Sequence, residues 1–171
     1  MEGSTDMFEV NDKVVYGVVG VCEIVDINKP PIKGIEGKYY FLQPVYDDKG
    51  IIYSPVESKK VMMRYVMSKE DAQKLYVRAQ NCKKDTALNE AVSPRDYDEV
   101  IKSQDAFELM RLIRTLYNIK NERAKNLRKM KSADLRMLMS ARKLLYGELA
   151  VSLDCEHKEL CEELDAMLGQ N

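Results

Sequence analysis

Residues 61–71, Val-Met-Met-Arg-Tyr-Val-Met-Ser-Lys-Glu-Asp, separate two parts of the sequence that differ in hydrophobic period. Before this stretch, apolar residues stand in short runs rich in β-branched and aromatic side chains, which favour strands. From Ser68 onward they recur at the three- and four-residue spacing of helices, and Ser68 followed by Asp71 is the signal of a helix N-terminus. The sequence therefore predicts a small β module that ends near residue 66 and a helical module after it.

The predicted β module consists of apolar runs separated by glycine, proline and aspartate. The runs are residues 14–16, 21–27, 39–45, 51–53 and 61–62. Asp47-Asp48-Lys49-Gly50 has the composition of a type I turn followed by a residue in the left-handed conformation, so residues 39–45 and 51–54 are expected to form a hairpin. Five short strands in about 55 residues indicate a small β-barrel.

The predicted helical module contains several N-terminal cap signals. Ser68, Ser93 and Ser132 each precede an acidic residue in the first turn, Pro94 occupies the favoured first helical position, and Ser103-Gln104-Asp105 repeats the cue. The apolar residues at helical spacing, which indicate core-facing stripes, are Ala106, Leu109, Met110, Ile113, Leu116 and Tyr117, then Leu135, Leu138, Met139, Leu145 and Leu149, and finally Leu160, Cys161, Leu164, Met167 and Leu168.

The composition is that of a soluble globular protein, with 45% apolar and 32% charged residues among 171. No apolar run approaches the roughly 20 residues that cross a bilayer, so no membrane contact is expected. The first residues lack the basic and apolar regions of a secretory signal. This predicts a cytoplasmic protein whose four cysteines are free thiols.

The residues show no pattern typical of catalysis, metal binding or cofactor binding. The chain has one histidine, His157, and the spacing of Cys155, His157 and Cys161 does not bring three ligands to one side of a helix. A nucleophile needs a neighbouring base, and a phosphate-binding loop needs a glycine motif between a strand and a helix, whereas Gly17-Val-Val-Gly20 is expected between two strands. We therefore expect a binding protein with no metal and no cofactor, rather than an enzyme.

Charge is unevenly distributed along the chain, although the formal net charge is only −1. Residues 111–145 carry 11 basic and two acidic side chains, whereas residues 146–171 carry one lysine and seven acidic side chains. The densest basic stretch, residues 123–131, has little apolar periodicity and is expected to be a loop between two helices. Such a loop can lay several cations along a phosphate backbone and release condensed counterions.

Two other interpretations of the basic segment stay open at this level. It can be a solvated surface that the acidic last helix neutralises, or it can bind an acidic protein partner. DNA binding of this kind would depend strongly on salt and would carry little sequence preference, because contacts to phosphate position a protein without reading bases.

Short motifs stand in a characteristic order from residue 7 to about residue 168. In the β module they are residues 7–16, Gly20, Ile32-Lys33-Gly34, residues 39–42 and Tyr53-Ser54-Pro55-Val56. In the helical module they are Ser103-Gln104-Asp105, residues 112–117, Arg136-Met137-Leu138, Ala141-Arg142 and Gly147-Glu148-Leu149-Ala150. Together they resemble the CarD family of bacterial transcription regulators, whose N-terminal module is shared with the transcription-repair coupling factor.

The resemblance implies an α+β protein, with a small Tudor- or SH3-like barrel over residues 7–66 and a compact all-helical domain over residues 67–171. In that family the barrel binds the β subunit of RNA polymerase, the helical domain touches promoter DNA, and the pair stabilises the open promoter complex. The alternative is an adaptor that binds polymerase or another protein without touching DNA. A monomer is expected.

The resemblance also suggests candidate contact residues. Candidates for the polymerase are Lys33, Tyr39, Ile51, Tyr53 and Pro55. Alternation along the strands predicts that Tyr53, and less clearly Phe41 and Val45, are exposed. Candidates for the DNA backbone are Arg95, Arg111, Arg114, Arg123, Lys125, Arg128, Lys129, Lys131, Arg136, Arg142 and Lys143. For Arg142, a structural pairing with an acidic residue is an equal alternative.

The chain departs from the family pattern in two respects. Members commonly carry a tryptophan in the helical domain that acts as a wedge at the DNA fork, and this chain has no tryptophan. The nearest aromatic residue is Tyr97, which is expected to pack inside its helix. Members also tend to carry arginines on the strands that meet the polymerase, where this chain has Pro30 and Tyr53.

Overall fold

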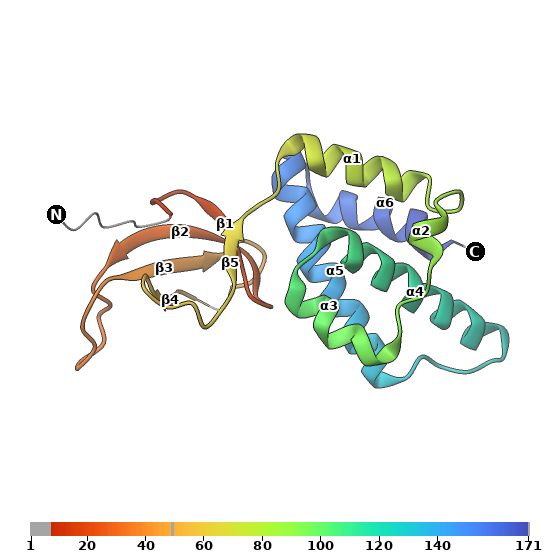
Figure 1. Ribbon diagram of the computed structural model, residues 1–171, viewed down its shortest axis with the longest axis horizontal. Coiled ribbons are helices and arrows are strands. Elements are labelled where there is room, and N and C mark those ends of the chain that lie inside the picture. The colour runs from red at the N-terminus through yellow and green to blue at the C-terminus, as the bar shows by residue number, and fades with distance from the viewer. Residues whose placement is uncertain (1–7, 49, 171) are drawn as a thin grey trace. The chain divides into compact units, whose positions relative to one another are not determined.

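The computed structural model describes residues 8–48 and 50–170, and the chain divides into two compact units between Val66 and Met67 (Figure 1). The first unit is a five-stranded antiparallel sheet and the second is helical. The expected α+β class is confirmed. Each unit has its own cluster of buried apolar residues.

The sheet of the first unit has the strand order β4-β3-β2-β1-β5. The strands are β1 (Lys13–Tyr16), β2 (Gly20–Asn28), β3 (Tyr39–Pro44), β4 (Ile52–Pro55) and β5 (Met63–Tyr65). The predicted hairpin is confirmed, because Tyr39 pairs with Pro55 and Leu42 pairs with Ile52. Strands β4 and β5 lie at the two edges of the sheet.

Alternation along these strands builds the core of the first unit. Its buried residues are Phe8, Val14, Cys22, Ile24, Tyr40 and Leu42. A register shift between Ile24 and Asp26 places Ile24 opposite Leu42 and Asp26 opposite Phe41. This bulge lets β2 continue with a polar residue on the side opposite the core.

The predicted last strand is wrong by two residues, since β5 begins at Met63 rather than Val61. The N–H of Gly17 donates to the carbonyl of Met62 at 2.8 Å, and Gly17 has a φ of 47°. Strand β1 therefore ends at Tyr16, and its pairing with β5 begins where Tyr16 lies opposite Met63. The expected type I turn includes Lys49, which lies outside the described residues.

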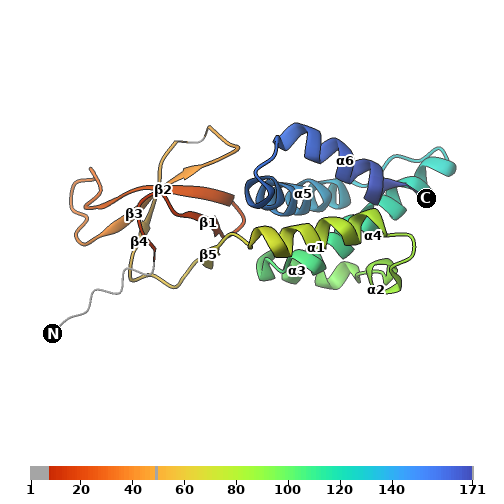
Figure 2. The same cartoon turned by 90° about the horizontal axis from the view of Figure 1, so that it is seen from above.

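The second unit contains six α-helices and one 3₁₀-helix within its described residues. They are α1 (Lys69–Gln80), α2 (Thr86–Asn89), η1 (Pro94–Asp96), α3 (Tyr97–Ser103), α4 (Ala106–Lys125), α5 (Ser132–Leu153) and α6 (His157–Gly169). Helix α5 contacts α1, α3, α4 and α6, and the views along two directions show these helices gathered around it (Figures 1 and 2). Helices α4 and α5 form a helical hairpin.

The caps explain where most of these helices begin. The Ser68 hydroxyl accepts from the N–H of Asp71 at 3.1 Å, as expected, and Ser93 with Pro94 starts η1. The predicted cap at Ser132 is wrong, because Ser132 is the first helical residue and the cap, Lys131, makes no side-chain bond. The fourth helix is capped by Asp105, whose carboxylate accepts from the N–H of Glu108 at 2.8 Å.

The apolar stripes form the core with two exceptions. Leu109, Met110 and Ile113 of α4 are fully buried. On α5, however, Leu135 and Met139 are exposed. They lie on the first two turns of the helix, on a side that no other helix of this unit covers. No helix in residues 8–48 and 50–170 has the length and apolar character needed to cross a membrane.

Candidate functional site

The side of the sheet opposite its core carries aromatic residues on β3 and β4. Tyr39 and Phe41 of β3 lie opposite Pro55 and Tyr53 of β4. The rings of Phe41 and Tyr53 are perpendicular, with centroids 4.8 Å apart. Tyr53 was predicted to be exposed but is half-buried, because this ring contact covers one of its sides. We call Tyr39, Phe41, Tyr53 and Pro55 the outer β3–β4 face.

The remaining polymerase candidates border this face in the sheet unit. Ile51 precedes the edge strand β4 and is exposed, as is Pro55 at its end. Lys33 is exposed in the β2–β3 connection, which the ion pair between Lys29 and Glu36 braces at 2.8 Å. On β2, Asp26 pairs with Phe41, so the face combines aromatic side chains with a carboxylate and carries no arginine.

The basic segment of the helical unit is centred on the loop between α4 and α5, residues 126–131, which we call the α4–α5 loop. Its conformation is held by the end of α4. The N–H of Arg128 donates to the carbonyl of Arg123 at 2.8 Å, and the Arg123 guanidinium donates through Nε to the carbonyl of Lys129 at 2.7 Å. Arg123 thus braces this loop through Nε and is half-buried.

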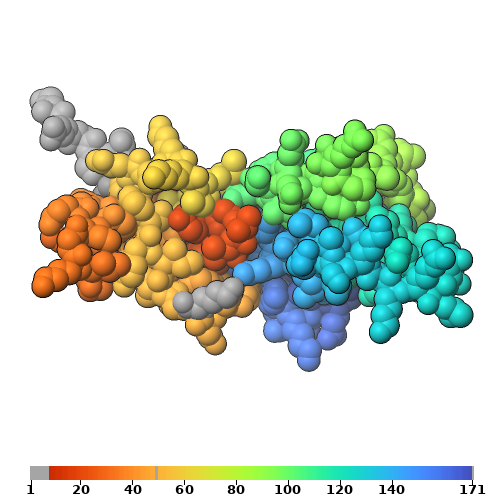
Figure 3. Space-filling view, turned by 90° about the horizontal axis from the view of Figure 1, so that it is seen from below, coloured from red at the N-terminus to blue at the C-terminus, as the bar shows by residue number. Residues whose placement is uncertain are grey.

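Four of the predicted DNA-binding residues display their charge to solvent together. They are Arg128, Lys129, Lys131 and Arg136, all of which are exposed. No ion pair involves them within the described part of the chain. We call these four residues the exposed cation cluster. The cyan and blue segments that carry it form one face of the helical unit with the green segment of α3 (Figure 3).

Arg95 lies on η1, which directly precedes α3. Burial, followed by the charge of Asp134, raises the pKa of the neighbouring Tyr97. Asp134 belongs to the first turn of α5, and helices α3 and α5 are in contact. Arg95 is exposed, and Tyr97 is buried as predicted. The burial of Tyr97 means that its ring is unavailable to a ligand.

Two predicted DNA-binding arginines of α4 have structural roles instead. Arg114 is only 6% exposed and donates through Nη1 to the carbonyls of Leu168, at 2.8 Å, and Gln170, at 2.5 Å. Arg111 pairs with Glu108 at 2.9 Å and also lies 3.7 Å from Glu90. These arginines anchor α6 and the segment before η1 to α4, so we leave them out of the candidate nucleic-acid surface.

Arg142 is also removed from that surface, because it belongs to a polar network around Asp165. Its Nε donates to Oδ1 of Asp165 at 3.0 Å, and its Nη2 forms an ion pair with Oδ2. The hydroxyls of Tyr117 and Tyr146 donate to the same Oδ1 at 2.6 and 3.0 Å. The structural alternative for Arg142 is therefore favoured over a DNA contact.

The last two candidates remain at the surface. Lys125 is exposed and pairs with Glu122, one turn earlier on α4, at 2.7 Å. Lys143 is exposed on α5, about two turns after Arg136. Among the ion pairs of the described residues, the one between Arg142 and Asp165 connects the basic segment to the acidic last segment. Neutralisation by α6 therefore does not involve the exposed cation cluster.

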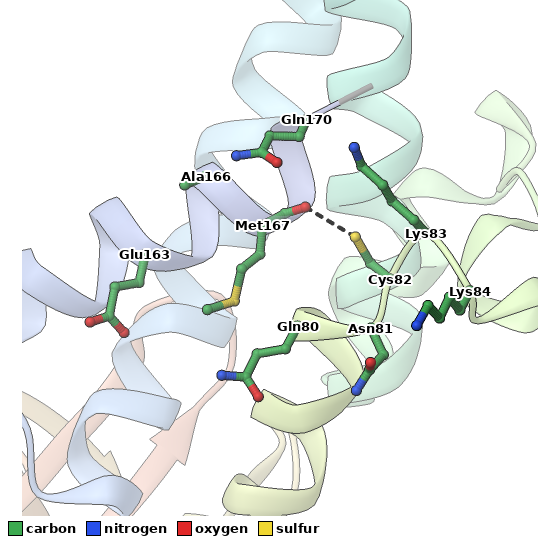
Figure 4. Close-up of a pocket in the computed structure, with 9 residues that line it drawn as sticks. All are labelled: Gln80, Asn81, Cys82, Lys83, Lys84, Glu163, Ala166, Met167 and Gln170. Atoms are coloured by element: carbon green, nitrogen blue, oxygen red, sulfur yellow. Dashed lines mark hydrogen bonds between the residues drawn. The ribbon is translucent and has the colours of Figure 1, made fainter.

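A hollow of about 510 Å³ lies at the ends of α1 and α6 (Figure 4). Its lining consists of Gln80, Asn81, Cys82, Lys83, Lys84, Glu163, Ala166, Met167 and Gln170. The Cys82 thiol donates to the carbonyl of Met167 at 3.0 Å, so it is already used in joining the two helices. Most of the polar lining is exposed to solvent, whereas ligand pockets place a few polar groups in a largely apolar cavity.

Histidine and cysteine do not form a metal centre in the described residues. The Cys161 sulfur lies 3.5 Å from Nε2 of His157, while Cys155 is exposed. No group of three or more histidine, cysteine, aspartate or glutamate side chains in residues 8–48 and 50–170 has the arrangement of a metal site.

Both units match known protein families. The model of the CarD-like/TRCF RID domain, the RNA polymerase-interacting domain of the transcription-repair coupling factor, matches residues 8–67. The model of the CarD C-terminal domain matches residues 76–165, which is more than half of the chain. The chain belongs to the CarD family. Its first unit is thus a Tudor-like RNA polymerase-interacting domain, and the protein is an RNA polymerase-interacting transcription regulator.

In this member of the CarD family, one exposed residue escaped the sequence patterns. Leu127, in the α4–α5 loop, is 97% exposed. The available signal was a leucine outside any apolar periodicity, between Asn126 and Arg128 in the densest basic stretch. Charge counting hides such a residue because it contributes no charge.

Proposed function

We propose that this CarD family protein binds the β subunit of RNA polymerase through its outer β3–β4 face and the phosphate backbone of promoter DNA through its exposed cation cluster. The two contacts together lengthen the life of the open promoter complex. The observation that carries the DNA half is that Arg128, Lys129, Lys131 and Arg136 are exposed without a described carboxylate partner, whereas Arg114 and Arg142 are engaged inside the unit.

The polymerase half is supported by the family of the first unit and by its edge strand. Strand β4 lies at an edge of the sheet, so a partner strand can pair with its backbone. The half-buried rings of Phe41 and Tyr53 present flat apolar surface beside this edge. Aromatic side chains of this kind are enriched at the centres of protein interfaces, where they bury much area at little entropic cost.

The DNA half is supported by the geometry of the cations. The braced α4–α5 loop and the start of α5 hold four cationic side chains within a stretch of nine residues, 128–136. Phosphate contacts from such side chains orient a protein on DNA and provide no base recognition. We therefore propose weak sequence preference.

Fluorescence anisotropy with a duplex promoter fragment tests the DNA contact. If the four cations each neutralise one phosphate, the logarithm of the binding constant falls against the logarithm of the salt concentration with a slope of about −3 to −4. Arg128→Ala and Lys129→Ala should each reduce that slope by about one. Lys158→Ala on α6 is the matched control, because Lys158 is an exposed lysine outside the cluster.

Two results would contradict the DNA contact. One is a DNA affinity that does not depend on salt concentration. The other is that Lys158→Ala changes the slope of DNA affinity against salt as much as Arg128→Ala does. The protein would then be an adaptor without DNA contact.

Cross-linking tests the polymerase contact. A photoreactive amino acid at Ile51 should label the β subunit of the polymerase, whereas the same group at Val10, which is 44% exposed, is the control. Pro55→Lys should weaken capture of the polymerase about tenfold, because a charge would enter the centre of the interface. Labelling of another subunit from Ile51 would refute the β-subunit assignment and leave the DNA contact untouched.

A further inference from the structure

Leu127 occupies a backbone position that normally belongs to glycine. Helix α4 ends at Lys125, and the N–H groups of Leu127 and Arg128 donate to the carbonyls of Ala124, at 2.9 Å, and Arg123, at 2.8 Å. This pair of bonds is a Schellman motif, in which Leu127 is the residue with left-handed backbone, and its φ is 54°. Glycine is favoured at that position because a Cβ is strained there.

The leucine side chain gains nothing from the fold in return for this strain. It is 97% exposed, the highest exposure among the large apolar residues of the described chain. The apolar contact that often accompanies a Schellman motif is missing as well, because the two positions that would make it are Arg123 and Arg128. An apolar residue that is both strained and solvated indicates a contact outside the folded unit.

The surroundings of Leu127 indicate the chemistry of that contact. Arg128, Lys129 and Lys131 follow it directly, and the loop that holds them is braced by the bond between Arg123 and the carbonyl of Lys129. Leu127 is the one exposed apolar residue within the α4–α5 loop, and such a side chain beside cations suits a nucleic acid, in which apolar groups enter the base stack while cations meet the phosphates. A protein interface or a membrane surface requires a larger apolar patch or an amphipathic helix, whereas the exposed Leu135 and Met139 lie outside this loop, on α5.

We propose that Leu127 is an apolar wedge that inserts between stacked base pairs of the DNA held by the exposed cation cluster. This inference rests on the proposed DNA contact and adds to it a residue and a deformation of the DNA. The insertion occurs most readily at pyrimidine–purine steps, because these steps unstack most easily. The Schellman motif holds the leucine at the start of the loop, directly after α4, so little additional ordering is needed on binding.

The experiment uses the full chain and a short duplex in which 2-aminopurine replaces the adenine of a single central TpA step. The protein has no tryptophan, so its emission does not interfere. Binding of the wild type should raise the 2-aminopurine fluorescence about twofold or more, because unstacking relieves quenching. A duplex without a pyrimidine–purine step should respond less.

Leu127→Gly is the decisive variant, because glycine removes the wedge and suits the backbone. Its thermal stability should equal or exceed that of the wild type. It should lose the 2-aminopurine response and bind the duplex about tenfold more weakly, while the slope of affinity against salt stays the same, because all cations remain. Leu127→Phe should retain the response, and Val77→Ala, at an exposed valine on α1, should leave both measurements unchanged.

The outcomes separate this inference from the proposed function. If the wild type binds DNA with the expected salt dependence but Leu127→Gly gives the same 2-aminopurine response, or the wild type gives none, the wedge is refuted and the DNA contact stands. If the wild type does not bind DNA, both fail. Loss of binding to phosphatidylglycerol vesicles in Leu127→Gly, with DNA binding unchanged, would overturn the wedge in favour of a membrane contact.

Discussion

Gly17 ends strand β1 at a point where two chain segments approach closely. Its φ is 47°, and a Cβ added to it would lie 2.7 Å from Cγ1 of Val61. The backbone N–H of Gly17 also binds the carbonyl of Met62 at 2.8 Å, so the chain cannot move away without losing that bond. The residue thus fixes where β5 starts, because pairing with β1 begins only at Met63.

We expect Gly17→Ala to lower the free energy of unfolding of the sheet unit by about 2 kcal/mol, since both the backbone angle and the contact with Val61 are unfavourable for a Cβ. Adding Val61→Ala should restore part of the loss, because it removes the clashing methyl group and leaves the backbone strain. Urea unfolding followed by circular dichroism measures both effects. Equal stability of Gly17→Ala and the wild type would show that the close approach is absent.

At the scale of helices, one carboxylate joins three elements. Asp165 of α6 accepts hydrogen bonds from Tyr117 of α4 and from Tyr146 and Arg142 of α5. Arg114 adds a second connection, from α4 to the carbonyls at the end of α6. The arginines near the two ends of the basic segment thus hold α6 in place, and the cations at its centre, in the α4–α5 loop and the start of α5, remain exposed.

Asp165→Asn should lower the free energy of unfolding of the helical unit by about 2 kcal/mol, because it leaves two tyrosine hydroxyls and a guanidinium competing for a weaker acceptor. Arg142→Ala should also destabilise the unit. Below its unfolding temperature, however, Arg142→Ala should keep the wild-type slope of DNA affinity against salt. A reduction of that slope by about one would return Arg142 to the DNA surface.

The same network predicts a loss of stability at alkaline pH. Burial raises the pKa of Tyr146, as does the charge of Asp165, and burial with the hydrogen bond to Asp165 raises the pKa of Tyr117. A raised pKa favours the protonated form in the folded state. The contribution of both tyrosines is therefore complete below about pH 10, where unfolded tyrosine begins to ionise, and is lost above it.

Unfolding temperatures measured from pH 8 to pH 11 test this expectation. The wild type should lose stability above about pH 10. Tyr146→Phe should be less stable at pH 8, because Asp165 loses a donor, but should show a shallower alkaline decline. An identical decline in both proteins would indicate that other groups cause it.

At the scale of the whole molecule, two units with separate cores carry two different surfaces. The aromatic outer β3–β4 face lies on one unit, and the exposed cation cluster lies on the other. Joining two weak contacts in one chain makes the second contact intramolecular and raises the overall affinity about a hundredfold or more when both can form at once. A regulator of this design needs both surfaces in the same chain.

We therefore expect the full chain to lengthen the lifetime of an open promoter complex, while an equimolar mixture of residues 8–66 and residues 67–170 does not. Residues 8–66 alone should still capture the polymerase, because the outer β3–β4 face lies within them. Circular dichroism of each fragment checks that it is folded. If the mixture acts as well as the full chain, covalent linkage plays no part, and if the folded sheet fragment fails to capture polymerase, the division of roles between the units is wrong.

The sequence alone determined the two modules, most of the strands, the hairpin of residues 39–45 with residues 51–54 and the cap at Ser68. These features follow from alternation, helical spacing and turn chemistry, which act over a few residues. The same local patterns misplaced the start of β5 and the cap at Ser132. They also counted Leu135 and Met139 as core, because spacing indicates that a stripe exists but not how far the neighbouring helices extend to cover it.

Only the tertiary structure distinguished the solvent-exposed cations from those that bind groups inside the helical unit. Arg114, Arg128, Arg136 and Arg142 look alike in the sequence, yet Arg114 and Arg142 bind groups that lie 54 and 23 residues away on α6, while Arg128 and Arg136 extend into solvent. Likewise, the strain and exposure of Leu127 appear only when the end of α4 is seen. Burial and pairing depend on which distant segments meet, and no short-range pattern contains that information.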